Sequence, residues 1–309
     1  MSIPSFGPTL VKRAMDLANK AYTGLSAFTD VKVVKYSEEN YLHHPCWFIV
    51  EDGNDVFEVV RVSGSDIDWE TDLDFTEIQG NYGGEKIHTH GGFYNSGKNV
   101  FSEMKATLKG YSGKNIYVTG HSLGGSVSKV LGLMIMTDSE TKNLNSYVLS
   151  FAPAPALAYI PTSVNKRFAM FVNNEDVITT LSIPNGHSLV NGAMTTASFI
   201  PSSVVKAAIK GAVGLLKNVP ADFAKSLLKA LENNIDKIVD AICAYHEDNT
   251  TAKVKNLIGT IYHFTSTSST KLADIVASPS DFQTIHVSIS ACTDHTPENY
   301  VKKVNALTA

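Results

Sequence analysis

The sequence predicts an α/β fold with a mostly parallel central sheet, because strand and helix signals alternate along the chain. A β-rich run at 115–119 is followed by a glycine turn and an apolar, helix-like run at 125–136. Two further runs rich in β-branched, aromatic and other apolar residues follow at 146–151 and 167–172. Strand, helix, strand, connection and strand is the order of parallel βαβ units, whose helices cover the faces of the sheet.

Length and composition fit one large domain of this class. The chain has 309 residues, of which 43% are hydrophobic and 18% are charged, and its formal net charge is −4. This balance is ordinary for a globular protein and argues against a nucleic-acid partner. We predict a single domain over residues 1–309, with a helical insertion at 189–245.

The N-terminal segment predicts an amphipathic helix, since Leu10, Ala14, Leu17 and Ala21 recur at helical spacing. It lacks the apolar core of about 7–15 residues that a secretory signal carries after its basic residues. No stretch approaches the roughly 18 uninterrupted apolar residues of a membrane span. These features favour an intracellular protein, soluble or peripheral to a membrane.

Short apolar runs predict the outer strands. Runs at 31–36 and 46–51 predict strands, and the turn at 52–55 predicts a hairpin between 47–50 and 56–62. A helix is expected at 96–108. Near the C-terminus we expect a strand at 258–264 and a terminal helix after a loop that carries His295.

Cysteines and paired histidines give little sign of a disulfide framework or of a bound metal. Cys46, Cys243 and Cys292 are an odd, sparse set, although one bridge among them stays open. His88 and His90 have no nearby cysteine or HExxH pattern, which favours a structural or rim role over metal binding. We therefore expect no metal and no cofactor.

The turn Gly120-His121-Ser122-Leu123-Gly124 fits G-x-S-x-G, the pattern of a nucleophile elbow. Its glycines lack a Cβ, so strand and helix can approach closely around a strained serine. Ser122 would lie at a helix N-terminus, where N–H groups and the dipole favour the oxyanion of acyl transfer. The pattern also arises by chance, but here it lies between a strand signal and a helix signal. The alternative is a glycine-rich turn with a structural serine.

A serine nucleophile needs a base to take its proton and an acid to orient that base. Hydrolases of this elbow type carry them in the order serine, acid, histidine, which Ser122, Asp176 and His295 satisfy. Asp176 follows the strand at 167–172, and Glu175 is its rival, with Asp294 a weaker one. The other histidines after Asp176 are His187, which follows the acid too soon, His246, which ends a helix, and His263 and His286, which look like strand positions.

The segment at 62–73 has a strand end, a glycine turn and then acidic and aromatic residues. We predict that it helps to form the oxyanion hole, with the backbone or hydroxyl of Ser65 acting beside the Leu123 N–H. The alternative for this segment is a capped loop.

Residues 189–245 differ from the rest and predict two helices at 202–218 and 221–245, separated by Pro220. The first has an apolar stripe, no acidic residue, and three lysines at 206, 210 and 217. Such a helix can bury its apolar face in a lipid interface while its lysines meet anionic head groups. We predict a helical cap with lipid contact through residues 202–218. The alternative is a permanently docked helical hairpin.

Several of these segments resemble the class 3 lipase family of α/β-hydrolases. The run 116–125, IYVTGHSLGG, matches its most specific motif, and HGGF at 90–93 is similar to its His-x-Gly-Phe. SFAPAP at 150–155 and NEDVITTLS at 174–182 are closest to the diacylglycerol-lipase-like branch, and Asp294-His295 with Tyr300 resembles the segment that holds the family's histidine. SGS at 63–65 resembles the oxyanion segment, with serines in place of its arginine and threonine.

The resemblance covers roughly residues 15–185 and 255–305 and leaves the helical insertion unexplained. It implies an α/β-hydrolase fold, the triad Ser122, Asp176 and His295, and a long-chain ester that yields a free fatty acid. The predicted function is hydrolysis of acylglycerol-type esters through an acyl-enzyme. The alternatives are an esterase or acyltransferase acting on a soluble ester, and a catalytically silent fold that binds lipid.

Overall fold

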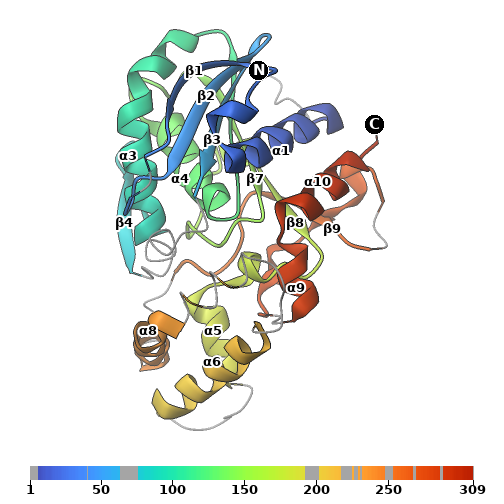
Figure 1. Cartoon of the computed structure of the whole chain (residues 1–309). Coiled ribbons are helices and arrows are strands. Elements are labelled where there is room, and N and C mark those ends of the chain that lie inside the picture. The colour runs from blue at the N-terminus through green and yellow to red at the C-terminus, as the bar shows by residue number, and fades with distance from the viewer. Residues whose placement is uncertain are drawn as a thin grey trace.

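An eight-stranded sheet forms the centre of the molecule (Figure 1). The computed structural model describes residues 6–39, 41–62, 76–191, 202–216, 225, 229, 232–247, 253–266, 269–285 and 288–308. The strand order is β1-β2-β3-β6-β7-β8-β9-β10. The strands are β1 (Lys32–Ser37), β2 (Cys46–Asp52), β3 (Asp55–Arg61), β6 (Asn115–His121), β7 (Asn145–Phe151), β8 (Phe168–Asn173), β9 (Thr260–Phe264) and β10 (Val276–Ala277).

Parallel pairing runs through the centre of this sheet and antiparallel pairing is confined to its margins. The pairs β3–β6, β6–β7, β7–β8 and β8–β9 are parallel, whereas β1–β2, β2–β3 and β9–β10 are antiparallel. The predicted mostly parallel sheet is therefore confirmed. The predicted hairpin is β2–β3, and Gly53 in its turn has φ +62°, a conformation that glycine adopts without steric cost.

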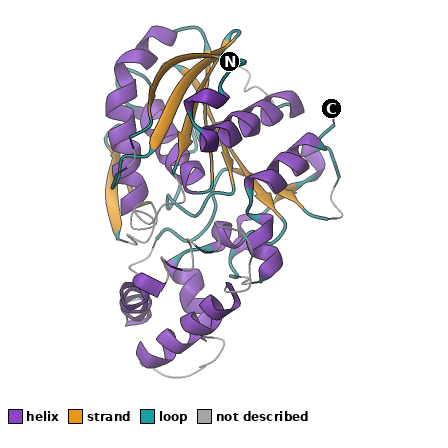
Figure 2. Cartoon of the chain, in the orientation of Figure 1, coloured by secondary structure: helices purple, strands orange, loops and turns teal. Residues whose placement is uncertain are grey.

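Helices cover both faces of the sheet, as the α/β prediction requires (Figure 2). Helices α1 (Pro8–Thr23) and α10 (Pro297–Asn305) pack on one face, and α3 (Gly91–Leu108) and α4 (Leu123–Thr137) pack on the other. Adjacent strand residues such as Phe48 and Ile49 belong to the two different apolar clusters. This alternation follows from the period of two in a strand, and it explains why central strands read as continuous apolar runs.

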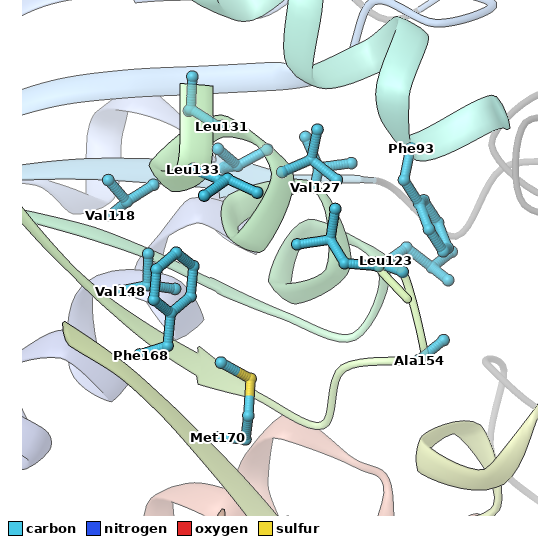
Figure 3. Close-up of a cluster of buried hydrophobic side chains, with 14 of the residues drawn as sticks. Phe93, Val118, Leu123, Val127, Leu131, Leu133, Val148, Ala154, Phe168 and Met170 are labelled. Carbon is cyan, nitrogen blue, oxygen red and sulfur yellow. The ribbon is translucent and has the colours of Figure 1, made fainter. Parts of the chain in front are cut away.

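Helix α4 is buried along nearly its whole length, between the sheet and α3. Leu123, Val127 and Leu131 lie in the apolar cluster that also contains Val118 and Val148 of the sheet (Figure 3). A helix that is apolar on all sides needs such enclosure. The helix that follows Ser122 is therefore held firmly by its surroundings.

Helices α5 (Ile183–Asn191), α6 (Ser202–Leu216) and α8 (Ile235–Glu247) group at one end of the molecule (Figure 1). Val205 of α6 is buried, and the Ile242 side chain lies against Gly186 of α5. Lys206 of α6 is paired with Asp236 of α8. The predicted helix at 202–218 thus corresponds to α6, while much of the predicted cap at 189–245 lies outside the described residues.

Several elements, helix α5 among them, were not expected from the sequence or differ from it in extent. Strands β4 (Glu77–Tyr82) and β5 (Glu85–His90) form a separate hairpin around Gly83 and Gly84, both with positive φ. Helix α3 begins at Gly91 rather than near 96. The short helix α9 (Ile289–Asp294), capped by the Ser288 hydroxyl, replaces part of the loop expected before the terminal helix.

Two further findings concern the cysteines and the membrane. No disulfide joins any two of Cys46, Cys243 and Cys292, so the bridge that the sequence left open is absent among these three residues. Within the described parts of the chain, no helix combines the length and apolar character needed to cross a bilayer.

Candidate active site

Ser122 lies at the sharp turn between β6 and α4, with φ +60°. Its N–H donates to the Phe151 carbonyl oxygen at 2.9 Å, which fixes the turn to the end of the neighbouring strand β7. A Cβ on Gly120 would lie 2.5 Å from Gly124, and one on Gly124 would lie 2.3 Å from the Val60 carbonyl oxygen. Only glycine fits at both positions, which is the packing that the elbow pattern predicts.

The structure brings together the three predicted triad residues. His295 Nε2 lies 2.7 Å from Ser122 Oγ, and His295 Nδ1 lies 2.8 and 2.9 Å from the two carboxylate oxygens of Asp176. An ionised carboxylate only accepts, so Nδ1 carries the proton and Nε2 accepts the serine hydroxyl. All three side chains are buried, with Ser122 only 6% exposed. The geometry is that of a serine positioned to lose its proton to an oriented imidazole.

Asp176 is held by more than the histidine. It follows β8, and its Oδ1 accepts the Ile178 N–H at 2.9 Å. Its Oδ2 accepts the Tyr300 hydroxyl at 2.7 Å, and that same hydroxyl accepts the Asn173 N–H at 2.9 Å. These donors stabilise the charged carboxylate in a site that excludes water. Burial, together with the neighbouring carboxylate of Asp176, raises the pKa of Tyr300 well above its usual value, so the phenol stays a donor.

The rival acids and histidines lie in other arrangements. Glu175 is exposed, and Asp294 accepts from the Asn174 side chain at 2.9 Å instead of facing His295. His263 Nε2 lies 2.7 Å from the Asn174 carbonyl oxygen, and the His187 ring packs edge-on against Tyr245. His246 lies in α8, and His286 lies outside the described residues. Among the candidates that the structure describes, only Asp176 and His295 form the hydrogen-bonded chain to Ser122.

His121, next to the nucleophile, supports the site from the side. Its Nδ1 lies 2.9 Å from the Tyr22 hydroxyl of α1, and its ring centre lies 4.9 Å from that of His295. Burial, with His295 close by, lowers the pKa of His121 well below its usual value. A neutral neighbour is suited to this place, because His295 must take up a positive charge during acyl transfer.

Leu123 is the first residue of α4, so its N–H is among those at a helix N-terminus that have no partner within the helix. That position agrees with the predicted oxyanion donor. The second predicted donor, Ser65, lies outside the described residues, as does the rest of the segment 63–75. His90 is buried and stacks on Phe93 where β5 meets α3, with ring centres 4.2 Å apart.

Tyr300 was named from the sequence only as part of the histidine segment, and its hydrogen bond to Asp176 leads to a test. Tyr300→Phe removes a hydrogen bond to a buried carboxylate, worth about 1.5–3 kcal/mol. It should slow the reaction of Ser122 with a fluorophosphonate by roughly tenfold and lower the melting temperature. Tyr262→Phe is the matched control, since Tyr262 stacks on Phe171 in the same sheet without touching the triad. Equal labelling rates in wild type and Tyr300→Phe would remove Tyr300 from the site.

Comparisons with known proteins agree with this assembly. The family described as Lipase (class 3) matches residues 59–188. A chloroplastic phospholipase A1 of Arabidopsis thaliana, PLIP2, is 25% identical over 188 residues, which are 58% of this chain and 24% of that protein. The chain thus spans about a quarter of the length of this curated relative.

Solved structures of fungal lipases are similar in fold. The triacylglyceride lipase of Rhizomucor miehei is 20% identical, with 56% of this chain and 73% of that chain covered, at a TM-score of 0.47. Lip2 lipase of Yarrowia lipolytica is 16% identical, with 55% and 73% covered, at a TM-score of 0.45. Residues 59–188, the stretch that matches the class 3 lipase family, carry both Ser122 and Asp176.

Proposed function

We propose that the protein is a serine hydrolase that cleaves carboxylic esters of acylglycerol-type lipids through an acyl-enzyme. The observation that carries this proposal is the hydrogen-bonded chain from Ser122 through His295 to Asp176 at a strand-to-helix elbow. Such a chain serves nucleophilic acyl transfer wherever it recurs on unrelated folds. The match of residues 59–188 to a lipase family supports a lipid ester over other acyl compounds.

The chemistry follows from the positions of these groups. Ser122 Oγ attacks the ester carbonyl while His295 Nε2 takes the hydroxyl proton, and Asp176 stabilises the imidazolium that forms. The Leu123 N–H and a donor from Ser65 hold the oxyanion. The tetrahedral intermediate collapses as His295 gives its proton to the departing alcohol. Water then attacks the acyl-enzyme while His295 takes one of its protons. The second tetrahedral intermediate collapses, His295 returns the proton to Ser122 Oγ, and the fatty acid is released.

Turnover of p-nitrophenyl esters of increasing chain length tests this proposal. A preference for long chains supports a lipid esterase, and a preference for short chains favours the alternative of a soluble ester. Absence of turnover, together with absence of fluorophosphonate labelling at Ser122, would leave a catalytically silent lipid-binding fold. A diacylglycerol and a phospholipid, compared as substrates, separate the head groups that the resemblance and the Arabidopsis relative suggest.

We further propose that residues 189–245 form a cap over the acyl site. Two observations support this. The triad is buried, so an ester reaches Ser122 only after some covering segment moves. Besides buried apolar contacts such as those of Val205 and Ile242, the described cap helices α6 and α8 are joined by the exposed ion pair between Lys206 and Asp236. Exposed pairs of this kind contribute little stability.

Contact of residues 202–218 with a lipid surface belongs to the same proposal. In the described arrangement Val205 is buried and Ile209 packs against the core, while Lys210 is exposed and Lys217 lies outside the described residues. The apolar stripe therefore meets lipid only if α6 lifts from its neighbours. The exposed Lys210 can meet anionic head groups first, without any rearrangement.

Lys210→Glu should weaken binding to vesicles that contain anionic lipid by about fivefold or more, since each lysine near such a surface contributes about 1 kcal/mol. Co-sedimentation with the vesicles measures this binding. Lys302→Glu on α10 makes the same charge change on an exposed helix away from the cap and should have little effect. Equal losses in the two variants would indicate a general charge effect and reject contact through α6.

A further inference from the structure

Lys129 is fully buried on α4, two turns after the nucleophile, and has no role in the chemistry described above. Its Nζ donates to the Ala154 carbonyl oxygen at 2.6 Å. Among the described residues, no carboxylate pairs with it. Burial lowers the pKa of Lys129 to about 7. A lysine kept at this cost in an apolar helix calls for an explanation.

The partner of Lys129 is a loop, residues 152–157, whose ends are bonded to the main chain elsewhere, by the Ala152 N–H to the Phe171 carbonyl oxygen and by the Ala156 carbonyl oxygen to the His90 N–H. Pro153 and Pro155 lack an N–H, so the loop has few donors of its own. The Ala154 N–H donates to Ser126 Oγ at 2.9 Å, and Ser126 Oγ lies 3.3 Å from the Ala154 carbonyl oxygen. Both main-chain groups of Ala154 are therefore bound by side chains of α4, and Lys129 makes the shorter contact to the carbonyl.

This loop begins beside the nucleophile. Phe151, the residue before it, accepts the N–H of Ser122 at 2.9 Å. Ala154 belongs to the same apolar cluster as Leu123 and Phe93, and Figure 3 shows the three at one end of that cluster. Leu123 directly follows Ser122 in the chain. Ala154 thus belongs to the buried apolar packing that adjoins the serine.

We propose that Lys129 is a positioning residue that, together with Ser126, holds the loop 152–157 as a fixed wall of the acyl-binding side of the site. The inference rests on the proposed function, because the wall affects only a substrate whose acyl chain lies against it. The long side chain spans the distance from the helix to the loop, and an amine donates to a carbonyl whether or not it is charged. Selectivity for acyl chains then depends on how firmly Ala154 is held.

Two variants and one matched control test the wall. Lys129→Met keeps the length of the side chain but removes the donor, and Ser126→Ala removes the second anchor. Ser128→Ala is the control, because Ser128 is equally buried on α4 but bonds only the Gly125 carbonyl oxygen at 2.7 Å within its own helix. Melting temperatures show whether each variant folds. If Lys129→Met does not fold, Ser126→Ala still tests the proposal.

The readouts are the labelling rates of Ser122 with an ethyl and a dodecyl fluorophosphonate, and amide exchange of the peptide that covers 152–157. We expect the ratio of the dodecyl to the ethyl rate to change by about tenfold in Lys129→Met, the low end for a methylene-sized change in an apolar pocket. Ser126→Ala should change it in the same direction. Exchange in the loop should be faster in both variants and unchanged in Ser128→Ala.

The outcomes separate this inference from the proposed function. Wild-type protein that fails to label at Ser122 contradicts the function, and the acyl wall is then rejected with it. If wild type labels but the ratio stays constant, or if both probes slow equally, the wall is wrong and the function stands. Unchanged exchange in the loop likewise shows that Lys129 and Ser126 do not hold it.

Discussion

Ser122→Ala should lower kcat for ester hydrolysis by several orders of magnitude and abolish fluorophosphonate labelling. The hydroxyl is the group that forms the acyl-enzyme, and nothing else at the elbow can replace it. The substitution removes one oxygen, so the melting temperature should stay close to that of wild type. Labelling that persists in Ser122→Ala would place the nucleophile at another residue.

His295→Ala should cost about as much as loss of the serine, and Asp176→Asn somewhat less, because triad members act as a unit. Combining Ser122→Ala with His295→Ala should therefore add little further loss. His263→Ala is the matched control, since His263 also bonds the segment after β8, through the Asn174 carbonyl oxygen, but lies outside the triad. Turnover that falls in His263→Ala and survives in His295→Ala would overturn the assignment of the base.

The sheet and the elbow could be predicted because their signals are local. The run at 115–136 carries a strand, a glycine turn and a helix within about twenty residues, and each part has its own periodicity or sterics. The order of Ser122, Asp176 and His295 along the chain narrowed the choice of acid and base. Their approach to within hydrogen-bond distance is a property of the fold alone.

The supporting contacts could not be predicted because they join distant parts of the chain. Tyr300 and Asp176 are separated by 124 positions, and Tyr22 and His121 by 99. The resemblance places Tyr300 in the segment of His295 without giving it a role, and Tyr22 stands in no local pattern that marks it as functional. The β4–β5 hairpin was different, since Gly83-Gly84 between two short runs was a usable turn signal.

Glu58 and Lys129 show a second limit of sequence reasoning, which is the depth of burial. Glu58 stands in the run Val56–Val60 on β3, between β2 and β6, and the sequence gives no sign that its carboxyl is enclosed. It lies on the same face of β3 as Val56 and Val60, the face that packs against α3 and α4. Both carboxyl oxygens are buried and find no hydrogen-bond partner in the described parts of the chain.

Glu58→Gln should make the protein more stable at neutral pH and remove a fall in stability with rising pH. Burial raises the pKa of Glu58 from 4.5 to about 8, so the folded protein keeps the carboxyl neutral while the unfolded chain ionises above pH 4.5. The contribution of the neutral Glu58 carboxyl to the free energy of unfolding is therefore fully present below pH 4.5 and is lost as pH rises toward 8. Each pH unit above 4.5 costs wild type about 1.4 kcal/mol of unfolding free energy relative to Glu58→Gln, so the loss reaches about 3 kcal/mol at pH 7.

Urea unfolding of wild type and Glu58→Gln between pH 4.5 and 7 measures this difference. The window lies between the pKa of 4.5, above which the unfolded chain ionises, and the pKa of about 8, at which Glu58 ionises in the folded protein. If the free energies of unfolding of the two proteins differ by a constant amount, the difference reflects only the buried amide of Glu58→Gln. The expected result is a difference that widens as pH rises. Glu51→Gln on β2 is the control, since Glu51 is partly exposed, and its hydrogen bond from Lys32 lowers its pKa. A gap that does not grow between pH 4.5 and 7 would mean that the Glu58 carboxyl ionises inside the fold, and that water or a movement of β3 reaches it.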